Sequence, residues 1–308
     1  MIQDLLHTLT SNSLKEKLFK EDIFYRESSE DLLNTLNGRF EGFYKNYTSL
    51  VFKPDAIVSR KVLHGIELLK ERGFIPVAFS LLRFNKHMIR EVWKYQFNAA
   101  SRDRLDLFDR LLVSSDCILI VLNYEGKKTI ENASEFLTTL KGCSSLKERK
   151  PEHLRYQLGW VNVMLNYIHV PDEPADFVRE LGIFFSGKTL DGILNESLAK
   201  KDVGPALKQF VEQVYSENPY HDLSFKNSLR RIQYTCETVL DSVKDPEQIK
   251  QIKTLIEACR SLLEEENKDW RKFIEQVNKA QIRADKWDLI TIISELATIN
   301  LSGATALL

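Results

Sequence analysis

The 308-residue chain has the composition of an ordinary globular protein, with 43% hydrophobic and 28% charged residues. Its formal net charge of −1 gives no electrostatic reason to expect nucleic acid or a membrane as a partner. No apolar run approaches the roughly 18–20 residues that span a bilayer, and the acidic Asp4 argues against a secretory signal. Four scattered cysteines without a CxxC pair argue against zinc or disulfide frameworks and fit a cytoplasmic location.

Residues 1–45 are predicted to form a helical N-terminal extension. Apolar residues recur three or four positions apart in LLHTLTSNSLKEKLF and in SEDLLNTLNGRFEGFY, and Ser28 or Ser29 is placed to cap the second segment. The extension carries no catalytic pattern. We therefore expect it to pack against the residues that follow.

Residues 46–187 alternate between strand and helix signals and are predicted to form one domain. The expected strands are β-prone runs at 47–52, 74–82 and 117–122, and a strand that ends near 168–169. Helical spacing separates them, and Gly73 is placed to end the first helix in a left-handed conformation. Strands that alternate with helices indicate a compact α/β or α+β domain.

Residues 188–308 show no strand signal and are predicted to form an all-helical domain. Helical spacing recurs in the segments 203–215, 223–243, 246–263, 269–283 and 287–301. The clearest helix begins with Asp245 as its N-cap and Pro246 as its first residue. The acidic run 264–266 is expected to be a solvated face or linker.

The candidate chemistry centres on His169, in the stretch KPEHLRYQLGWVNVMLNYIHVPDEPADFVRELGIFF at 150–185. Glu180 follows this histidine by eleven residues and Arg155 precedes it by fourteen. An imidazole that attacks phosphorus needs a carboxylate to hold its tautomer, polar donors for the phosphate and cations for the developing charge. The stretch has a candidate for each, although a lone histidine is most often structural.

Several short motifs, in order, resemble the signature of nucleoside diphosphate kinases over roughly Tyr47 to Phe185. They are Lys53-Pro54-Asp55 after a strand, Lys150-Pro151 followed by Arg155, Asn166-x-x-His169, and Glu180 before Leu181-Gly182-Ile183-Phe184-Phe185. Each motif alone is weak, but their order and spacing together are specific. The resemblance implies an α+β fold with a ferredoxin-like βαββαβ core. It also implies a histidine that carries phosphate between nucleotides by a ping-pong mechanism.

The resemblance implies a role for each motif residue. Lys53 and Arg155 would neutralise nucleotide phosphates. Asn166 would contact the sugar or phosphate; the alternative is that Asn166 is only a turn residue. His169 would attack the γ-phosphate while Glu180 fixes the proton on its other ring nitrogen. Arg60 would serve the same anion as Lys53, or be only a surface charge at a helix N-terminus.

An aromatic clamp for the base is also implied. Trp93 or Tyr95 is near the family's stacking position, and Leu107 or Phe108 is near the opposing one. Ordinary core packing is the alternative interpretation of these side chains.

Two departures from the family pattern lower the expected rate. Val170-Pro171-Asp172 stands where the family has glycine-serine after the histidine, so a hydroxyl that bonds the glutamate is lost. The family's arginine before the Lys-Pro motif has no direct match. Ser144 could replace the phosphate-binding threonine, and Lys141, Lys147 or Arg149 could supply the missing cation.

Two functions remain open on the sequence alone. The first is slow or specialised phosphoryl transfer between nucleoside tri- and diphosphates through a phosphohistidine at His169. The second is a catalytically weak nucleotide-binding module whose state is read out by the C-terminal helices. Either would use Mg²⁺ held through the nucleotide phosphates, with no protein metal cluster. We expect a homo-oligomer and a protein partner for the C-terminal helices, and neither a membrane nor a nucleic acid as a partner.

Overall fold

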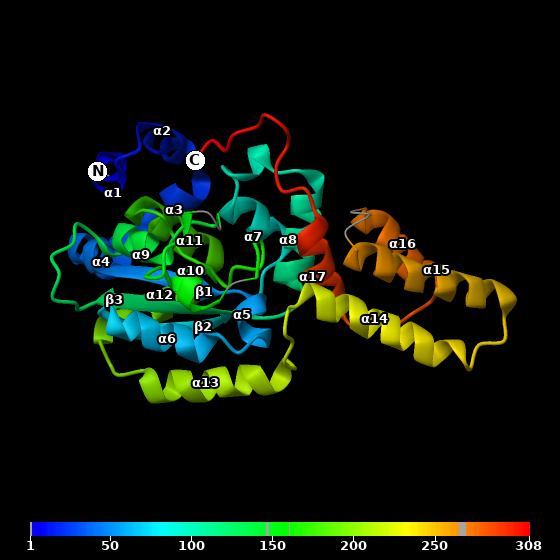
Figure 1. The fold of residues 1–308 in the computed structure, drawn as a ribbon. Helices are drawn as coiled ribbons and strands as arrows, with labels where there is room; N and C mark the ends of the chain where they lie inside the picture. Colours follow the sequence, from blue (N-terminus) through cyan, green and yellow to red (C-terminus); the bar gives the residue numbers. More distant parts are fainter. Residues whose placement is uncertain (1, 146–147, 160, 265–268) are drawn as a thin grey trace.

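A four-stranded antiparallel sheet forms the centre of the computed structural model, which describes residues 2–145, 148–159, 161–264 and 269–308 (Figure 1). The strands are β1 (Tyr47–Phe52), β2 (Phe74–Leu82), β3 (Cys117–Tyr124) and β4 (Ile168–His169), in the order β2-β3-β1-β4. Helical segments connect β1 to β2 and β3 to β4, so β1 and β3 lie side by side in the centre. This order is that of a ferredoxin-like βαββαβ core, and the predicted α+β class is confirmed.

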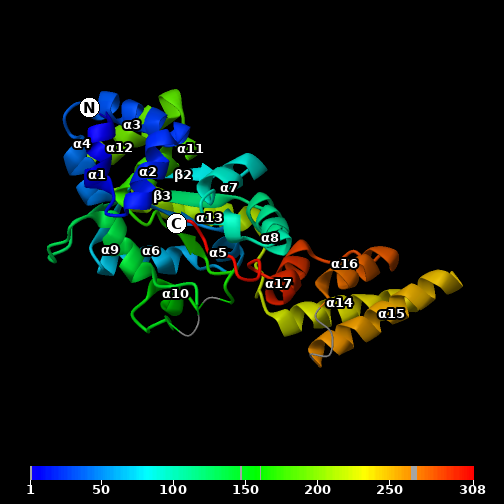
Figure 2. The same cartoon turned by 90° about the horizontal axis from the view of Figure 1, so that it is seen from above.

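Helices surround this sheet and continue beyond it (Figures 1 and 2). Before and within the sheet region they are α1 (Ile2–Leu9), α2 (Ser13–Glu21), α3 (Ile23–Leu36), α4 (Phe40–Asn46), α5 (Pro54–Val58), α6 (Val62–Glu71), α7 (Lys86–Val92), η1 (Phe97–Ala99), α8 (Arg102–Val113), α9 (Ala133–Lys141), α10 (Leu154–Gln157) and α11 (Pro174–Phe184). After it come α12 (Gly187–Ala199), α13 (Gly204–Glu217), α14 (Phe225–Leu240), α15 (Pro246–Leu263), α16 (Trp270–Lys279) and α17 (Lys286–Leu296). In the part of the chain that the structure describes, no helix is both long and apolar enough to cross a membrane.

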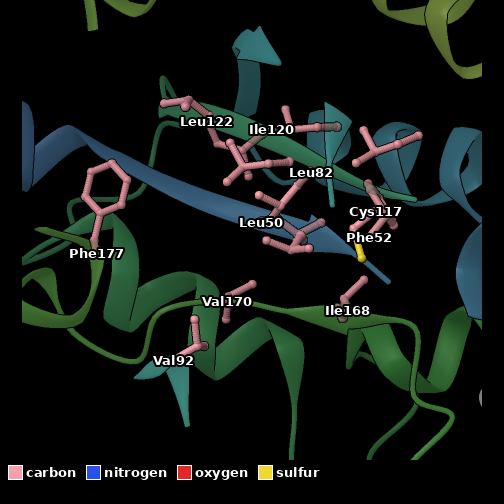
Figure 3. Packing of buried hydrophobic residues seen from close by; sticks show 14 of the residues in the cluster. Leu50, Phe52, Leu82, Val92, Cys117, Ile120, Leu122, Ile168, Val170 and Phe177 are labelled. Carbon is pink, nitrogen blue, oxygen red and sulfur yellow. The ribbon is translucent and has the colours of Figure 1, made fainter. Parts of the chain in front are cut away.

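The sheet core holds the short strand β4 in place. β1 is buried along its whole length, and Val51 and Phe52 pair with His169 and Ile168. Ile168 and Val170 are 1% exposed and lie beside the apolar side chains of β1 and β3 (Figure 3). Because side chains alternate along an extended chain, His169 between them points away from this core.

The N-terminal extension is helical as predicted, but its caps are not the predicted serines. Asn12 caps α2 and Asp22 caps α3, each by accepting backbone N–H bonds with its side chain. Ser28 and Ser29 lie inside α3 and are buried, where they donate to the carbonyls of Val178 and Tyr25. Because the N-cap of α3 is six residues before Ser28, both serines lie inside the helix and are buried instead of capping it.

Two hydrophobic cores divide the chain at a different place from the expected boundary between 187 and 188. The larger core contains the extension, the sheet and apolar residues of α12 and α13. The smaller core is built from α14 to α17. α17 joins the two, because Trp287 and Ile290 belong to the larger core and Ile292 to the smaller. We therefore propose that the C-terminal helical unit begins near Ser224 and that α12 and α13 are part of the sheet domain.

The last residue of β1 before the Lys-Pro-Asp motif packs so closely on α6 that no methyl group fits between them. A Cβ added at Gly65 would lie 2.6 Å from Cε1 of the Phe52 ring. We expect Gly65→Ala to lower the free energy of unfolding by about 1–3 kcal/mol through overpacking. Denaturant unfolding monitors this, with Gly42→Ala as the control, because a Cβ there meets nothing within 4 Å. Equal stability of the two variants would contradict the packing described.

Candidate active site

His169 and Glu180 form a direct pair at the edge of the sheet. Nε2 of His169 lies 2.8 and 3.0 Å from the two carboxylate oxygens of Glu180. A carboxylate can only accept, so this geometry puts the ring proton on Nε2 and leaves the lone pair on Nδ1. Among the described residues no hydrogen bond to Nδ1 is found. The Glu180 side chain is 7% exposed and that of His169 17%, so the pair is shielded while the ring still faces a cavity.

The Lys-Pro-Asp motif holds the loop that leads into His169. Nζ of Lys53 donates to the Met164 carbonyl (2.8 Å) and lies 3.7 Å from the Asp55 carboxylate. The Tyr167 N–H donates to the same carboxylate (2.8 Å). Lys53, Asp55 and Tyr167 thus form a clasp between the end of β1 and this loop. Tyr167 has a left-handed backbone with φ of 69°, which these bonds stabilise. Burial lowers the pKa of Lys53, although Asp55 opposes this shift. A phosphate nearby would also oppose it and favour the charged ammonium.

Most of the predicted site residues line one cavity of about 240 Å³. The members that sequence analysis named are Lys53, Trp93, Phe108, Ser144, Arg155, Asn166, His169 and Glu180, with Tyr95 and Lys141 among its alternatives. Asn166 uses its amide nitrogen to hold the loop, donating to the Val163 carbonyl (2.7 Å). The structure thus places residues from α7, α8, α9, α10, β4 and α11, together with Lys53 directly after β1, around the imidazole.

An aromatic wall stands beside the histidine. The ring centroid of Trp93 lies 5.0 Å from that of His169 and 4.9 Å from that of Phe108, both in edge-to-face arrangements. Of the two residues considered for the opposing position, Phe108 lines the cavity, whereas Leu107 is fully buried. The exposed Val163 lines the cavity as well.

Basic side chains outnumber acidic ones around the cavity. Among the residues that the structure describes, five basic side chains line it, against three carboxylates; they are Lys53, Arg104, Lys141, Arg155 and Arg179, against Asp172, Asp176 and Glu180. Arg155 donates to the carbonyls of Gly142 and Ile168, and burial lowers its pKa to about 10. Lys53, Lys141 and Arg179 each have a carboxylate partner, whereas Arg104 and Arg155 bond only neutral groups among the described residues. Two partly buried cations without a carboxylate partner favour a polyanionic ligand.

The cation that the family pattern lacks has two candidates here. Lys141 lines the cavity and pairs with Asp172 at 2.8 Å. Arg104 also lines it, and burial lowers the pKa of its guanidinium. Arg104 was missed by sequence analysis because it lies in α8, far from every motif. Arg149 instead donates to the carbonyls of Cys143 and Ser144, and Lys147 lies outside the described residues.

Arg60 is the one predicted site residue that the structure places elsewhere. Its guanidinium donates to the carbonyls of Tyr215 and Asn218 and lies 4.6 Å from the centre of the Tyr215 ring. Its backbone is left-handed, with φ of 61°, at the turn between α5 and α6. This turn directs the side chain toward α13 and away from the cavity, so Arg60 fastens α13 to the sheet domain.

The sheet domain is similar in sequence to known proteins. Residues 46–190 match the family model described as nucleoside diphosphate kinase, and this part of the chain is a domain of that family. The nucleoside diphosphate kinase of Archaeoglobus fulgidus is 28% identical over 158 residues, which are 50% of this chain and 94% of that protein. The enzyme of Pelotomaculum thermopropionicum is 26% identical over 143 residues, 46% of this chain and 89% of that protein.

Two further matches complete the comparison. Thioredoxin domain-containing protein 6 of Xenopus laevis is 27% identical over 156 residues, so the chain matches 50% of its own length but only 24% of that protein. A crystal structure of the Aquifex aeolicus nucleoside diphosphate kinase matches 46% of this chain and 96% of that one, with 21% identity and a TM-score of 0.39.

The different positions of Arg60 and Arg155 give a matched test of the site. We expect Arg155→Gln to raise the dissociation constant for Mg-ADP by roughly 10- to 100-fold, because a charge-assisted contact is lost. Arg60→Gln should leave this constant within about twofold and speed amide exchange in α13. Isothermal titration calorimetry and hydrogen exchange measure the two effects. Equal losses of affinity in both variants would contradict the placement of Arg60.

Proposed function

We propose that the chain is a nucleoside diphosphate kinase-like phosphotransferase with His169 as its nucleophile. The observation that carries the proposal is the His169–Glu180 pair, which leaves Nδ1 open toward a cavity rich in basic side chains. In the first half-reaction the Nδ1 lone pair attacks the γ-phosphorus of a nucleoside triphosphate. The bond to the β–γ bridging oxygen breaks, and the diphosphate leaves with that electron pair. A second diphosphate then takes the phosphoryl group from His169.

The chain's own residues supply the other parts of this mechanism. Glu180 would hold the Nε2 proton and stabilise the positive charge that the ring gains. Lys53, Lys141, Arg104 and Arg155 would bind the phosphates, and Trp93 with Phe108 would contact the base. Asn166 shapes the loop and borders the cavity. A hydroxyl does not follow the histidine here, since Pro171 stands there, so we propose a slower enzyme than the family's usual members.

Mg²⁺ would be held by the nucleotide, and it would reduce the charge on the β- and γ-phosphates. The cavity carboxylates fit this assignment, because each already has a protein partner: Asp172 with Lys141, Asp176 with Lys15, and Glu180 with His169. Among the described residues no group of three or more histidine, cysteine or acidic side chains could hold a metal.

We also propose a cytoplasmic location and a homo-oligomer. The four cysteines are free, and three of them are buried, which is compatible with a reducing compartment. The oligomer rests on the family relationship.

Phosphohistidine formation tests the proposed reaction. Incubation with γ-labelled ATP and Mg²⁺ should label the protein with an acid-labile phosphate, and His169→Ala should abolish the label. Glu180→Gln should slow labelling by roughly 10- to 100-fold, the usual effect of losing a group that orients a reactive histidine. His153→Ala is a matched control, since His153 lies outside the cavity lining. Labelling that persists in His169→Ala would contradict the proposal.

A specific feature favours a second function, nucleotide-dependent regulation read out by the C-terminal helices. Residues 298–308, which we call the C-terminal strap, run along residues 95–104 at the cavity wall. The Ser101 N–H donates to Ile299 (3.1 Å), Leu301 donates to Ala99 (2.9 Å) and Leu307 donates to Tyr95 (3.0 Å).

The strap also touches the cavity itself. Arg104 donates to the Asn300 side chain at 2.9 Å, and Leu308 is part of the cavity lining. α16 adds a further link, since Trp270 and Arg271 bond Asp103 of α8. A ligand that moves Arg104 would therefore disturb the strap and the helical unit together.

Hydrogen exchange tests the second function. We expect saturating Mg-ADP to change the exchange rates of amides in 298–308 at least about tenfold, since bonds of the strap to 95–104 would be altered. Amides in α13, which packs on another part of the domain, serve as the internal control. Unchanged strap exchange with bound nucleotide would exclude this readout.

A further inference from the structure

The N-terminal extension contributes a side chain to the wall of the cavity. Phe19 of α2 lines the cavity. Lys15, on the same helix, is only 6% exposed. Its ammonium lies 2.6 Å from the Glu173 carboxylate and 2.5 Å from that of Asp176. These carboxylates cap the start of α11, the helix that carries Glu180. Lys15 is therefore buried, paired with two carboxylates and connected to the start of α11.

Asp176 connects this lysine to the reactive pair. It lines the same cavity as His169 and precedes Glu180 by one helical turn, so the two carboxylates share a face of α11. Burial raises the pKa of Asp176 to about 6, while Lys15 opposes the rise. Without Lys15, an ionised Asp176 would leave an uncompensated negative charge beside Glu180, in a cavity that must accept polyphosphate.

Other charged groups close to this carboxylate have their own partners. Lys141 of α9 pairs with Asp172, and Arg179 of α11 lies between Asp22 of α3 and Glu91 of α7. The charged or titratable groups around Asp176 are Lys15, Asp172, Glu173 and Glu180, with His169 and, on the same helix, Arg179 also lining the cavity. Lys15 is the cation among them that contacts Asp176 directly, at hydrogen-bond distance.

We propose that Lys15 is a positioning residue for the chemistry at His169, because its ammonium neutralises Asp176 and anchors the start of the helix that presents Glu180. The inference rests on the proposed function and extends it: the N-terminal extension is an integral part of the active site. Lys15 touches no reacting atom and acts through Asp176.

A charge-compensation experiment on the full chain tests this role. The variants are Lys15→Met, Asp176→Asn, the double variant and Lys15→Arg, with Lys17→Met as a matched control on the exposed face of α2. For each, the single-turnover rate of phosphohistidine formation and the dissociation constant for Mg-ADP are measured between pH 6 and 8.5. Unfolding curves confirm that each variant is folded.

Lys15→Met should lose rate and ADP affinity, by up to roughly tenfold at pH 8.5 and much less at pH 6. Because Lys15 opposes the rise in the pKa of Asp176, its removal shifts the ionisation of this carboxylate to a pH above 6. The loss should grow with pH because the unneutralised carboxylate of Asp176 repels phosphate only when it is ionised. Asp176→Asn cannot ionise, so adding it should restore Lys15→Met to within about threefold of the wild type. Lys15→Arg keeps the charge and should behave like the wild type, as should Lys17→Met.

The possible outcomes separate this inference from the proposed function. A loss that is the same at every pH and is not restored by Asp176→Asn would show a purely structural role and overturn the inference. If Lys15→Met does not fold, failure of the double variant to fold would overturn it too, whereas recovery would support it. A wild type that forms no phosphohistidine would refute the proposed function, and the ADP affinities would still decide the role of Lys15. Absence of ADP binding would overturn both.

Discussion

The buried clasp between Lys53, Asp55 and Tyr167 is the contact on which the site depends. It ties the end of β1 to the loop before β4, and the short β4 has only two paired residues to fix its own position. Two strand pairs alone would be a weak support for the imidazole of His169. The clasp adds a buried charge pair and a backbone bond, and Pro54 begins a helix directly behind it.

Electrostatics shape the rest of the cavity. Five basic side chains face three carboxylates, and burial works against the charge of several of them, as the lowered pKa of Arg155 and Lys53 shows. Such a site is more costly to maintain empty than filled by a phosphate chain. Lys53, Arg155 and Arg179 also hold backbone or carboxylate groups in place, so the same cations that face the cavity connect its walls.

Local signals explain which features could be predicted from the sequence. The four strands and the helix 246–263 follow from β-prone runs and from Asp245-Pro246, and the structure has them within a few residues. Eight of the nine site candidates border one cavity because ordered motifs keep their spacing in a shared fold. Arg60 lies outside this cavity because its left-handed backbone directs the side chain toward α13, and no motif records that conformation. Arg104, Asp176 and Lys15 were missed because only tertiary packing brings them to the histidine.

The boundary near residue 187 was placed by the loss of strand signals, which cannot show what a helix packs on. The division that we propose assigns α12 and α13 to the sheet domain because their apolar residues belong to the larger core, where the rings of Phe210 and Phe79 lie 5.0 Å apart.

The span of the cavity lining along the chain has a consequence for folding. Its walls include Phe19 and Leu308, almost the whole described length apart. Contacts between residues so distant in sequence close late, because chain entropy must be lost before they form. The sheet can therefore form well before the pocket is complete, and competence to bind should lag behind secondary structure during refolding.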